Sequence, residues 1–260
     1  MSPNKKRLDR VVVEKKLAHS RQRARALIMA GKVLVNNHPV DKPGTQVSTE
    51  DVVVLKGEDI PYVSRGGLKL ESALQVLAGD ITGFTCLDVG ASTGGFTDCL
   101  LQHGANRVFA VDVGYGQLAW PLRQDPRVVV IERTNIRYMP AEALPQLVDL
   151  VTIDVSFISL KKVVPEVLKF MKKSAGILGL IKPQFEVGKG NVGKGGVVRD
   201  PVLHAQVIED LSDYFTKLSL IREFVIPSPL LGPKGNREFF IFLKIGNDEL
   251  SPRSNEDLEV

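Results

Sequence analysis

Four charged residues that lie far apart in the chain stand beside predicted strands or inside a predicted helix. Asp154 and Lys182 each follow directly on a short apolar run, and Glu238 directly precedes one. Lys69 lies in the helix-like segment "SRGGLKLESAL". If the four side chains met, two lysines and two carboxylates could activate a hydroxyl group, which is a poor nucleophile on its own. Lys182 could either remove the hydroxyl proton or only align the hydroxyl, and the sequence leaves both open. Each position alone has an ordinary explanation, because an Asp after a strand is often a helix N-cap and a Lys there is often a surface residue.

A glycine-rich turn predicts where a ligand would bind. The stretch "LDVGASTGGFTDCLL", residues 87–101, combines an apolar strand, the pattern D-x-G-x-x-x-G-G and the start of an amphipathic helix. Glycines let the backbone pass close to a ligand and enter the next helix tightly. Asp112 ends the second strand and is placed to accept hydrogen bonds from both hydroxyls of a ribose. The predicted cofactor contacts are Asp88, Gly90, Ser92, Gly94, Gly95, Phe96, Asp112, Asn135 and Asp154.

The turn resembles the S-adenosylmethionine loop of Rossmann-like methyltransferases, so S-adenosylmethionine is the expected cofactor. Its spacing is not G-x-G-x-x-G and no second dinucleotide half is visible, but a nicotinamide cofactor stays open as the alternative. The segment "GKGNVGKG", residues 188–195, nearly matches a phosphate-binding P-loop. Gly195 stands where the Mg²⁺-binding Ser or Thr is needed. We therefore expect a flexible loop over the active site here, and no ATP site.

The elements that must position these residues alternate between apolar strands and helical segments from residue 85 onward. Strands are expected at residues 86–89, 108–111, 128–131, 150–153, 177–181, 220–226 and 239–243, with helices that include 160–172 and 202–217. The alternation predicts an α/β fold, a Rossmann-like and mostly parallel seven-stranded sheet covered on both faces. Ligands of such sheets bind at the carboxyl ends of the strands, where Asp154 and Lys182 are expected. Glu238 reaches the same edge if the last strand is antiparallel.

The first part of the chain has the pattern of a small basic α+β domain. Residues 1–32 hold ten Lys or Arg against two acidic residues, a net charge of +8, so the rest of this +4 chain carries −4. Helices over 7–17 and 21–30, the second with Ser20 as N-cap, precede the short β runs "KVLVNNHPV" and "DVVVLKG". The pattern resembles the RNA-binding domain of the S-four ribosomal protein type, although an acidic protein partner stays open. The expected RNA contacts are Arg7, Arg10, Arg21, Arg23, Arg25 and Lys32.

Composition limits the class of protein further. The apolar fraction of 43% and the charged fraction of 25% are ordinary for a globular protein. The apolar runs are far shorter than the roughly 18 residues that span a bilayer, and the basic N-terminus lacks the apolar segment of a secretory signal. Cys86 and Cys99 form no disulfide framework or metal-binding spacing, and both are expected in packed positions. We therefore expect a cytoplasmic protein with no membrane partner and no metal.

The chain resembles the TlyA family, whose members join an S-four-type domain to an FtsJ-like ribose methyltransferase domain and were historically labelled haemolysins. The resemblance is carried by "SRGGLKL", "LDVGASTGGFTDCLL", "VDVGYGQLAW", "ERTNIR", "DVSFISL", "KPQFEVGKG", "GGVVRD" and "SPLLGPKGNREFF". It implies 2′-O-methylation of cytidine in ribosomal RNA with S-adenosylmethionine, and ribosomal subunits as partners. By the same resemblance, the catalytic tetrad falls on Lys69, Asp154, Lys182 and Glu238. The linker matches less well, because "IPYV" stands where some relatives have an Arg- and Trp-containing tetrapeptide.

The expected organisation follows from these motifs. An S-four-type RNA-binding domain occupies residues 1–60 and a methyltransferase domain residues 61–248, with a linker at 57–67 and a polar tail at 249–260. Three other functions fit the sequence less well. A haemolysin needs membrane-spanning or strongly amphipathic apolar segments, which the sequence lacks. The intact charged positions disfavour a non-catalytic RNA- or ribosome-binding factor with a vestigial methyltransferase fold. A base methyltransferase would usually have an Asn/Asp-Pro-Pro-aromatic motif or a catalytic Cys, and "DVSF" after the fourth strand is neither.

Overall fold

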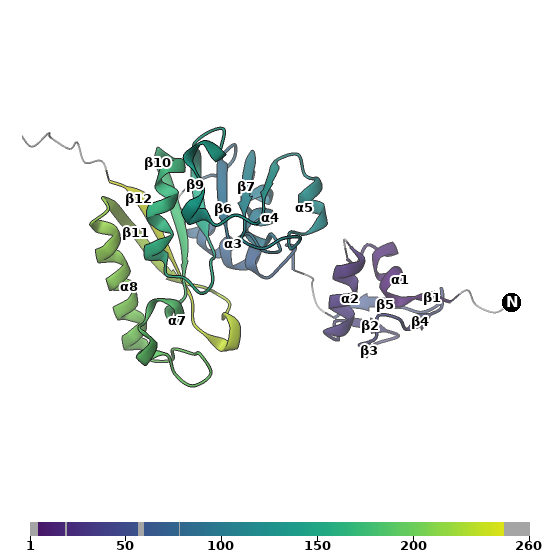
Figure 1. The fold of residues 1–260 in the computed structure, drawn as a ribbon. Helices are drawn as coiled ribbons and strands as arrows, with labels where there is room; N and C mark the ends of the chain where they lie inside the picture. Colours follow the sequence, from purple (N-terminus) through teal and green to yellow (C-terminus); the bar gives the residue numbers. More distant parts are fainter. Residues whose placement is uncertain (1–4, 19, 57–59, 78, 247–260) are drawn as a thin grey trace, which may run out of the picture. The chain divides into compact units, whose positions relative to one another are not determined.

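The computed structural model describes residues 5–18, 20–56, 60–77 and 79–246 and divides into two compact units (Figure 1). The first unit is Met1–Ile60 and the second is Pro61–Val260. The polar tail predicted at 249–260 lies outside the described residues, as do residues 57–59 of the predicted linker. Each unit has a hydrophobic core of its own.

The first unit packs two helices on short antiparallel strands. Its elements are β1 Lys6–Arg7, α1 Leu8–Glu14, α2 Arg21–Met29, β2 Val33–Val35, β3 His38–Val40, β4 Gln46–Val47 and β5 Val53–Leu55. Strand β2 lies between β3 and β5 in one sheet, and β1 pairs with β4. The core contains Leu8 and Val12 of α1, Ala24 and Ile28 of α2, and Val33 of β2.

Both predicted helices of this unit form, but the first is shorter than predicted. Helix α2 begins as predicted, because the Ser20 side chain accepts a hydrogen bond from Arg23 N and caps the helix. Arg7 belongs to β1 instead of α1. Helix α1 ends at Glu14, shortly before Lys16, whose φ of +57° does not fit a right-handed helix.

The second unit contains a seven-stranded sheet. Its strands are β6 Thr85–Val89, β7 Arg107–Val111, β8 Val128–Ile131, β9 Val148–Ile153, β10 Met171–Ile181, β11 Leu220–Pro227 and β12 Phe239–Ile245, in the order β11-β12-β10-β9-β6-β7-β8. The neighbours from β10 to β8 are parallel, and β12 runs antiparallel to both β10 and β11. The predicted α/β fold with a mostly parallel seven-stranded sheet is confirmed, together with the antiparallel last strand.

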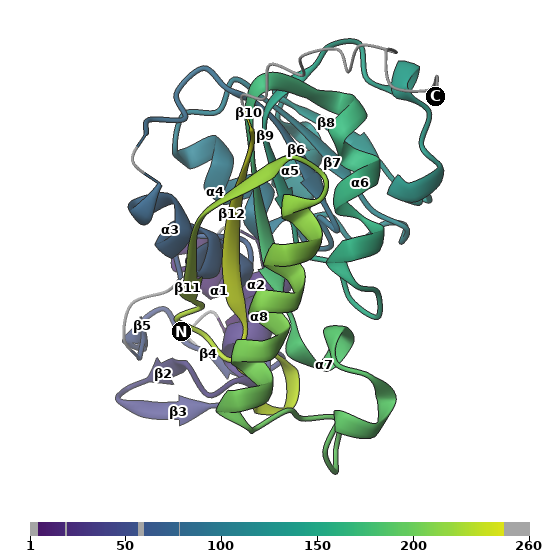
Figure 2. The same ribbon diagram turned by 90° about the vertical axis from the view of Figure 1, so that its left-hand side faces the viewer.

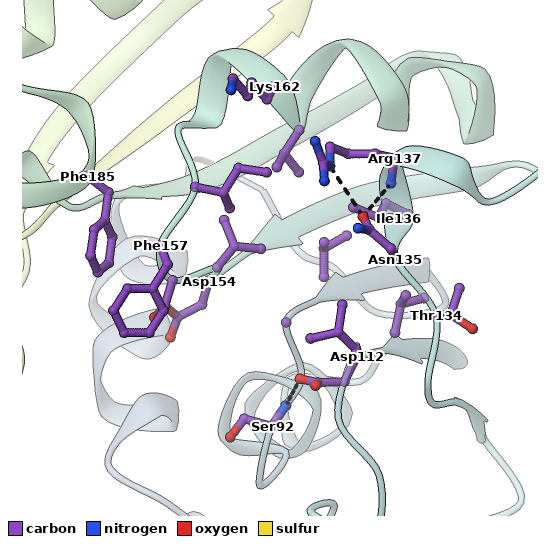
Figure 3. Close-up of a pocket in the computed structure, with 18 of the residues that line it drawn as sticks. Ser92, Asp112, Thr134, Asn135, Ile136, Arg137, Asp154, Phe157, Lys162 and Phe185 are labelled. Carbon is purple, nitrogen blue, oxygen red and sulfur yellow. Dashed lines mark hydrogen bonds between the residues drawn. The ribbon is translucent and has the colours of Figure 1, made fainter. Parts of the chain in front are cut away.

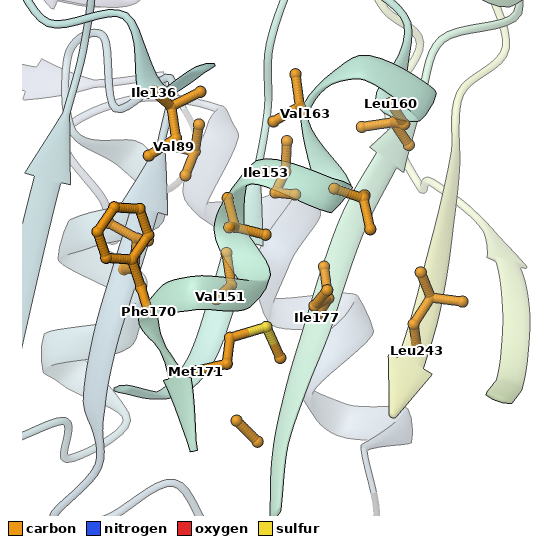
Figure 4. Close-up of a cluster of buried hydrophobic side chains, with 14 of the residues drawn as sticks. Val89, Ile136, Val151, Ile153, Leu160, Val163, Phe170, Met171, Ile177 and Leu243 are labelled. Carbon is orange, nitrogen blue, oxygen red and sulfur yellow. The ribbon is translucent and has the colours of Figure 1, made fainter. Parts of the chain in front are cut away.

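Helices cover both faces of this sheet. They are α3 Gly66–Val76, α4 Gly95–Gln102, α5 Trp120–Gln124, α6 Val164–Val167, α7 Pro183–Glu186 and α8 Pro201–Thr216. Helices α3, α4 and α5 pack on one face, and α6 and α8 pack on the other, with α8 alongside β11 (Figure 2). On β9, Val151 and Ile153 belong to the core under α6 and α8 (Figure 4), whereas Leu150 belongs to the core under α3 and α4. Because both faces are buried, such strands are apolar at successive positions.

The strand register brings the predicted site residues to one edge. Val89 pairs with both Val111 and Ile153, so β6, β7 and β9 end at the same level. Ile181 pairs with Phe239, so β10 ends beside the start of the antiparallel strand β12. The residues next to these strand ends are Gly90, Asp112, Asp154, Lys182 and Glu238.

A single helix over residues 160–172 does not form. Instead, the short 3₁₀ turn η3 Leu160–Lys162, helix α6 and the turn η4 Leu168–Phe170 follow one another, and β10 already begins at Met171. Pro165 lies in the first turn of α6, where its missing N–H costs no hydrogen bond. A helix running through this position from residue 160 would lose a hydrogen bond and clash with the proline ring.

Residues 61–67 of the predicted linker belong to the second unit. Tyr62 is 4% exposed and packs in the core under α3 and α4. Val63 N donates a hydrogen bond to Asp98 Oδ2 at 2.7 Å, and α3 begins at Gly66. The prediction that the linker extends to residue 67 is therefore wrong. A buried aromatic side chain ties this segment to the sheet domain.

Candidate active site

Two adjoining cavities open at this edge of the sheet. The larger has a volume of about 870 Å³ and is lined by residues that follow β6, β7 and β9 and by segment 134–137 (Figure 3). The smaller has a volume of about 300 Å³ and is lined by the start of α3, the glycine-rich turn and segment 230–233. Gly90, Ser92 and Asp154 line both cavities, which therefore share a wall.

The larger cavity holds a fixed carboxylate beside apolar walls. Asp112 Oδ2 accepts a hydrogen bond from Ser92 N at 2.8 Å, and Asp112 Oδ1 accepts one from Gly114 N at 2.6 Å. Because each carboxylate oxygen has more than one lone pair, both can still accept a hydrogen bond from a ligand. The apolar lining includes Val89, Val111, Val113, Ile136, Val155 and Val163. This combination suits a ligand with a flat apolar ring and a pair of hydroxyl groups.

Asn135 lies on the same cavity with part of its amide engaged. Its Oδ1 accepts a hydrogen bond from Arg137 N at 3.2 Å and caps the 3₁₀ turn η1 Ile136–Tyr138 (Figure 3). Its amide nitrogen donates no hydrogen bond within the part of the chain that the structure describes. That nitrogen can therefore donate to an acceptor on a bound ligand.

All four charged residues line the smaller cavity, where they form two ion pairs. Lys69 Nζ lies 2.6 Å from Glu238 Oε2, and these side chains are 13% and 0% exposed. Lys182 Nζ lies 2.6 Å from Asp154 Oδ1, and these side chains are 9% and 24% exposed. Pairing offsets part of the cost of removing each charge from water. The structure thus brings together the two lysines and two carboxylates that the sequence placed on four distant segments.

Two further polar atoms determine what the smaller cavity can bind. Ser156 Oγ accepts a hydrogen bond from Lys182 Nζ at 3.1 Å, so the amine is held by two partners. Glu238 Oε1 is buried and accepts no hydrogen bond from any described residue. A buried carboxylate oxygen without a donor is costly, so a donor on a ligand would stabilise it. Gly232 packs directly against this oxygen and leaves no room for a side chain between them.

Asp88 lines neither cavity, contrary to the prediction that it contacts the cofactor. It is completely buried and accepts hydrogen bonds from Thr97 Oγ1 at 2.6 Å and from Thr152 Oγ1 at 3.1 Å. Burial raises the pKa of Asp88 to about 6. Asp88 is therefore an internal support that ties β6 to α4 and β9 beneath the glycine-rich turn.

Three other predicted cofactor contacts in the turn lie outside the larger cavity. Gly95 and Phe96 line the smaller cavity and not the larger one. Gly94 lines neither. Its φ is +93°, and the side chains of Leu118 and Leu122 occupy the space that a Cβ would need. Gly94 thus serves the backbone geometry at the start of α4.

Two aromatic residues of the larger cavity were not predicted. Phe157 is 90% exposed and has a φ of +64°, and its ring centroid lies 5.1 Å from that of Phe185 (Figure 3). A bulky residue at positive φ is strained, and such strain is concentrated at functional sites. One feature of the sequence could have indicated that these two residues belong to the site. Each Phe follows a predicted site residue, Asp154 or Lys182, by three positions.

The loop predicted over the active site, residues 188–195, lines neither cavity. The segment that follows it is attached to the loop before β12. Asn236 Oδ1 accepts a hydrogen bond from Val198 N at 3.0 Å, and Asn236 Nδ2 donates one to Gly196 O at 3.0 Å. A loop that covers the site stays a prediction.

The basic residues of the first unit lie at its surface. The predicted RNA contacts, all exposed or half-exposed, are Arg7, Arg10, Arg21, Arg23, Arg25 and Lys32. Arg7 Nε and Nη2 donate to Asp9 at 3.1 and 3.0 Å, and Arg21 Nε donates to Asp9 at 3.1 Å. The Asp9 side chain is 0% exposed, whereas those of Arg7 and Arg21 are 42% and 52% exposed. One buried carboxylate thus holds two guanidinium groups at the surface.

The described residues contain no membrane-spanning helix, no metal site and no disulfide. In the described ranges, no helix combines the length and apolar character needed to cross a membrane. No three or more His, Cys, Asp or Glu side chains of the described residues are grouped so as to hold a metal ion. Cys86 and Cys99 are both free thiols and both buried, as predicted.

Two family models match the chain. The model described as FtsJ-like methyltransferase matches residues 62–245, which is more than half of the chain. The model described as S4 domain, the S-four type, matches residues 6–53.

Individual relatives match almost from end to end. The Mycobacterium tuberculosis protein described as 16S/23S rRNA (cytidine-2′-O)-methyltransferase TlyA is 49% identical over 253 residues, which cover 96% of this chain and 94% of that protein. Hemolysin A of Brachyspira hyodysenteriae is 39% identical over 234 residues, which cover 90% and 97%. A solved structure from Streptococcus thermophilus, described as a candidate hemolysin, has a TM-score of 0.74 at 40% identity and covers 95% of this chain and 90% of its own.

Proposed function

The chain belongs to the TlyA family of FtsJ-like methyltransferases, and we propose that it methylates the ribose 2′-oxygen of a cytidine in ribosomal RNA with S-adenosylmethionine. One observation carries the proposal. The cavity that holds Lys69, Asp154, Lys182 and Glu238 shares a wall with a cavity large enough for a nucleoside-like cofactor. A methyl donor and an acceptor hydroxyl bound in the two cavities would meet at that wall, beside Asp154.

The chemistry of the larger cavity fits S-adenosylmethionine. Asp112 would accept hydrogen bonds from the two ribose hydroxyls, and the amide nitrogen of Asn135 would donate to the adenine ring. The apolar walls would enclose that ring, while the shared wall of Gly90, Ser92 and Asp154 would receive the methionine end. When bound, S-adenosylmethionine supplies an electrophilic methyl group.

The residues of the smaller cavity would bind and align the acceptor hydroxyl. Lys182 Nζ, held by Asp154 and Ser156, would donate a hydrogen bond to the 2′-oxygen. The buried Oε1 of Glu238, which accepts no hydrogen bond from a described residue, would accept one from the 2′-hydroxyl and take its proton as the oxygen is methylated. Lys69 would neutralise and orient Glu238 through its ion pair. Holding two reactants in line supplies a large part of the rate of such reactions.

The first unit supports an RNA acceptor. Its basic helix α2 and the paired guanidinium groups of Arg7 and Arg21 present positive charge at the surface. A domain this small is expected to contact phosphates and the shape of a structured RNA more than base edges. Ribosomal RNA and cytidine are supported by the Mycobacterium tuberculosis relative, which is named for those substrates at 49% identity.

The experiment that tests this function is direct. Each ribosomal subunit is incubated separately with the protein and with S-adenosylmethionine labelled in the methyl group. The RNA is then digested to nucleosides and analysed by mass spectrometry. We expect the label on 2′-O-methylcytidine. Label on a base, or no transfer to either subunit, would contradict the proposal.

The cofactor assignment has a separate test. Calorimetry should show binding of S-adenosylmethionine that the Asp112→Ala substitution weakens by about 10-fold or more, because hydrogen bonds to a charged group contribute about 1.5–3 kcal/mol. Tight binding of a nicotinamide dinucleotide in place of S-adenosylmethionine would overturn the assignment.

A further inference from the structure

Hydrogen bonds connect the segment that carries Asp154 to helix α7, which follows Lys182. The residue of α7 that makes these bonds lies outside both cavities. The segment, residues 154–159, follows β9, and Lys182 is the N-cap of α7. Glu186, the last residue of α7, accepts a hydrogen bond from Ser159 Oγ at 2.6 Å through Oε2 and one from Leu160 N at 2.9 Å through Oε1. Glu186 lines neither cavity, so it has no direct contact with either ligand site.

The other end of this segment is fixed to the sheet. Asp154 N donates a hydrogen bond to Val89 O at 2.9 Å, which continues the pairing of β9 with β6. Between the two ends, Phe157 has a strained φ of +64°. Segment 154–159, called the span below, is therefore held at both ends and strained between them. One end is held by the end of strand β9 and the other by the carboxylate of Glu186.

Few other contacts hold the span against α7. Among the described residues, the only other hydrogen bonds or ion pairs between the two are those of Lys182 with Asp154 and Ser156. The rings of Phe157 and Phe185 add one side-chain contact. The amine of Lys182 thus depends for its position on a segment that Glu186 keeps in place.

We propose that Glu186 is a positioning residue for the reaction, which keeps segment 154–159 at the separation from α7 at which Asp154 and Ser156 hold Lys182. The inference rests on the proposed function in one respect, that Lys182 aligns the acceptor hydroxyl. Loss of Glu186 releases segment 154–159 and shifts both partners of the Lys182 amine. The same segment lines one side of the larger cavity, whereas Asp112 and Asn135 line it from other segments and keep their places.

The chemistry of the contacts explains why a carboxylate stands at this position. Ser159 Oγ already accepts a hydrogen bond from Lys161 N at 3.1 Å, so its own proton is available to Glu186. A carboxylate accepts from this hydroxyl and from Leu160 N at the same time, one bond to each oxygen. A glutamine keeps an acceptor for Leu160 N and can donate to Ser159 Oγ, whereas an alanine leaves both donors without a partner.

The first measurement requires no methyl transfer. Acetylation of lysines by an N-hydroxysuccinimide ester, followed by peptide mass spectrometry, reports how firmly Lys182 is held. In the wild type we expect slow labelling, because Lys182 is 8% exposed and paired with Asp154. Glu186→Ala should accelerate labelling of Lys182 by about 10-fold, since two hydrogen bonds to a charged group are lost. Glu186→Gln should stay close to the wild type.

Glu166→Ala provides a matched control. Glu166 lies on α6, is 41% exposed and pairs with Lys169 across 3.5 Å, so it is a glutamate of the same region with no link to the span. Its removal should leave the labelling of Lys182 unchanged. Equal labelling of Lys182 in Glu186→Ala and in the wild type would overturn the inference.

The second measurement separates positioning from folding. Glu186→Ala should lower kcat on ribosomal subunits by about 10- to 100-fold, because a displacement of about 1 Å can cost about 100-fold in rate. Its affinity for S-adenosylmethionine should fall much less than kcat, because Asp112 and Asn135 lie on other segments of the larger cavity. Glu186→Gln should restore most of kcat. A loss of kcat that only follows the loss in Tm, without rescue by Gln, would overturn the inference. If the wild type transfers no methyl group, the proposed function fails, and the labelling of Lys182 still decides the role of Glu186.

Discussion

Both units bury a carboxylate completely, but the two carboxylates have opposite surroundings. Asp9 of the first unit accepts hydrogen bonds from Arg7 and Arg21, and these guanidinium groups hold the pKa of Asp9 below its usual range. Asp88 of the second unit is bonded by Thr97 and Thr152 and by no cation among the described residues, and burial raises its pKa to about 6. The same residue type is thus stabilised as an anion in one place and penalised as an anion in the other.

The difference reflects what each acid supports. Around Asp9, the arginines extend to the surface of the first unit, where a polyanion can contact them. Above Asp88 lies a turn that lines two cavities, and the cations of that region pair with carboxylates inside the smaller cavity. We therefore expect the first unit to determine RNA affinity and the second to determine chemistry. The following predictions test this division, from the largest expected effect to the smallest.

Removal of the Lys182 amine should have the largest effect, and this effect should be on kcat and not on binding. Lys182→Ala should lower kcat by about 10²- to 10³-fold, the range for loss of one positioned hydrogen-bond donor to a reacting oxygen. Affinities for S-adenosylmethionine and RNA should change little, because Lys182 lines only the smaller cavity. Lys172→Ala is the control, since Lys172 stands at the start of β10 and is paired with Asp149 at 2.7 Å. Weakened RNA binding with unchanged kcat in Lys182→Ala would break the division.

Neutralisation of the basic helix α2 should have the next largest effect, and this effect should be on the affinity for RNA and not on kcat. Replacing Arg21, Arg23 and Arg25 together with Gln should weaken RNA binding by about 10- to 100-fold. The slope of log K against log salt should fall by about 2–3, because each lost phosphate contact contributes about 0.7–0.9. At saturating RNA, kcat should be that of the wild type.

A control with the same change in charge distinguishes a specific surface from net charge. Lys217, Arg222 and Lys244 lie near the end of the second unit's sheet that is remote from the cavities, at the end of α8 and on β11 and β12. Their joint replacement with Gln should change RNA affinity much less. Equal losses in both triple variants would show that the first unit has no special role.

The sequence allowed prediction of the sheet and its edge, because both depend on local patterns. Runs of four to seven mostly apolar residues marked every strand of the second unit's sheet, and Asp154 and Lys182 directly follow two of them. The register of parallel strands then brings such residues to one edge. Asp154 and Lys182 could be placed together for that reason, whereas Lys69 was placed by the family resemblance and Glu238 by an antiparallel last strand.

The directions of side chains could not be predicted in the same way. Both faces of a parallel strand are buried, so the pattern does not show that Asp88 points away from the cavities. The apolar spacing of residues 160–172 satisfied a helix, but Pro165 and the start of β10 at Met171 divide the segment. Tyr62 is a single aromatic in a polar stretch, and only tertiary packing reveals that it belongs to the second unit.

The buried acid of the second unit should leave a signature in the pH dependence of stability. The folded protein binds a proton at Asp88 more tightly than the unfolded chain does, because the pKa rises from 3.8 to about 6. This contribution is complete below the unfolded pKa and is lost as pH rises through the folded pKa. The free energy of unfolding of the wild type, relative to Asp88→Asn, should therefore fall by about 2 kcal/mol between pH 4 and pH 7.

Urea unfolding of both proteins over this pH range measures the effect. Other titrating groups are common to the two proteins and cancel in the difference. A difference that does not vary with pH would show that Asp88 is not penalised as an anion, and the contrast with Asp9 would disappear.

The smallest expected effect tests whether Asp9 orients its arginines or only neutralises them. Asp9→Asn adds one positive charge to the first unit, which by itself should strengthen RNA binding. It also removes the carboxylate that holds Arg7 through two hydrogen bonds and Arg21 through one. Ordering a freed side chain on binding costs about 0.5–1.5 kcal/mol, so we expect a net weakening of about threefold. Glu14→Gln gives the control, because it removes one negative charge from the same helix, at a side chain that is 51% exposed and paired only with Lys6 among the described residues. That variant should bind RNA slightly more tightly. If Asp9→Asn also binds more tightly, the acid neutralises the arginines without orienting them, and the two buried carboxylates differ in charge balance alone.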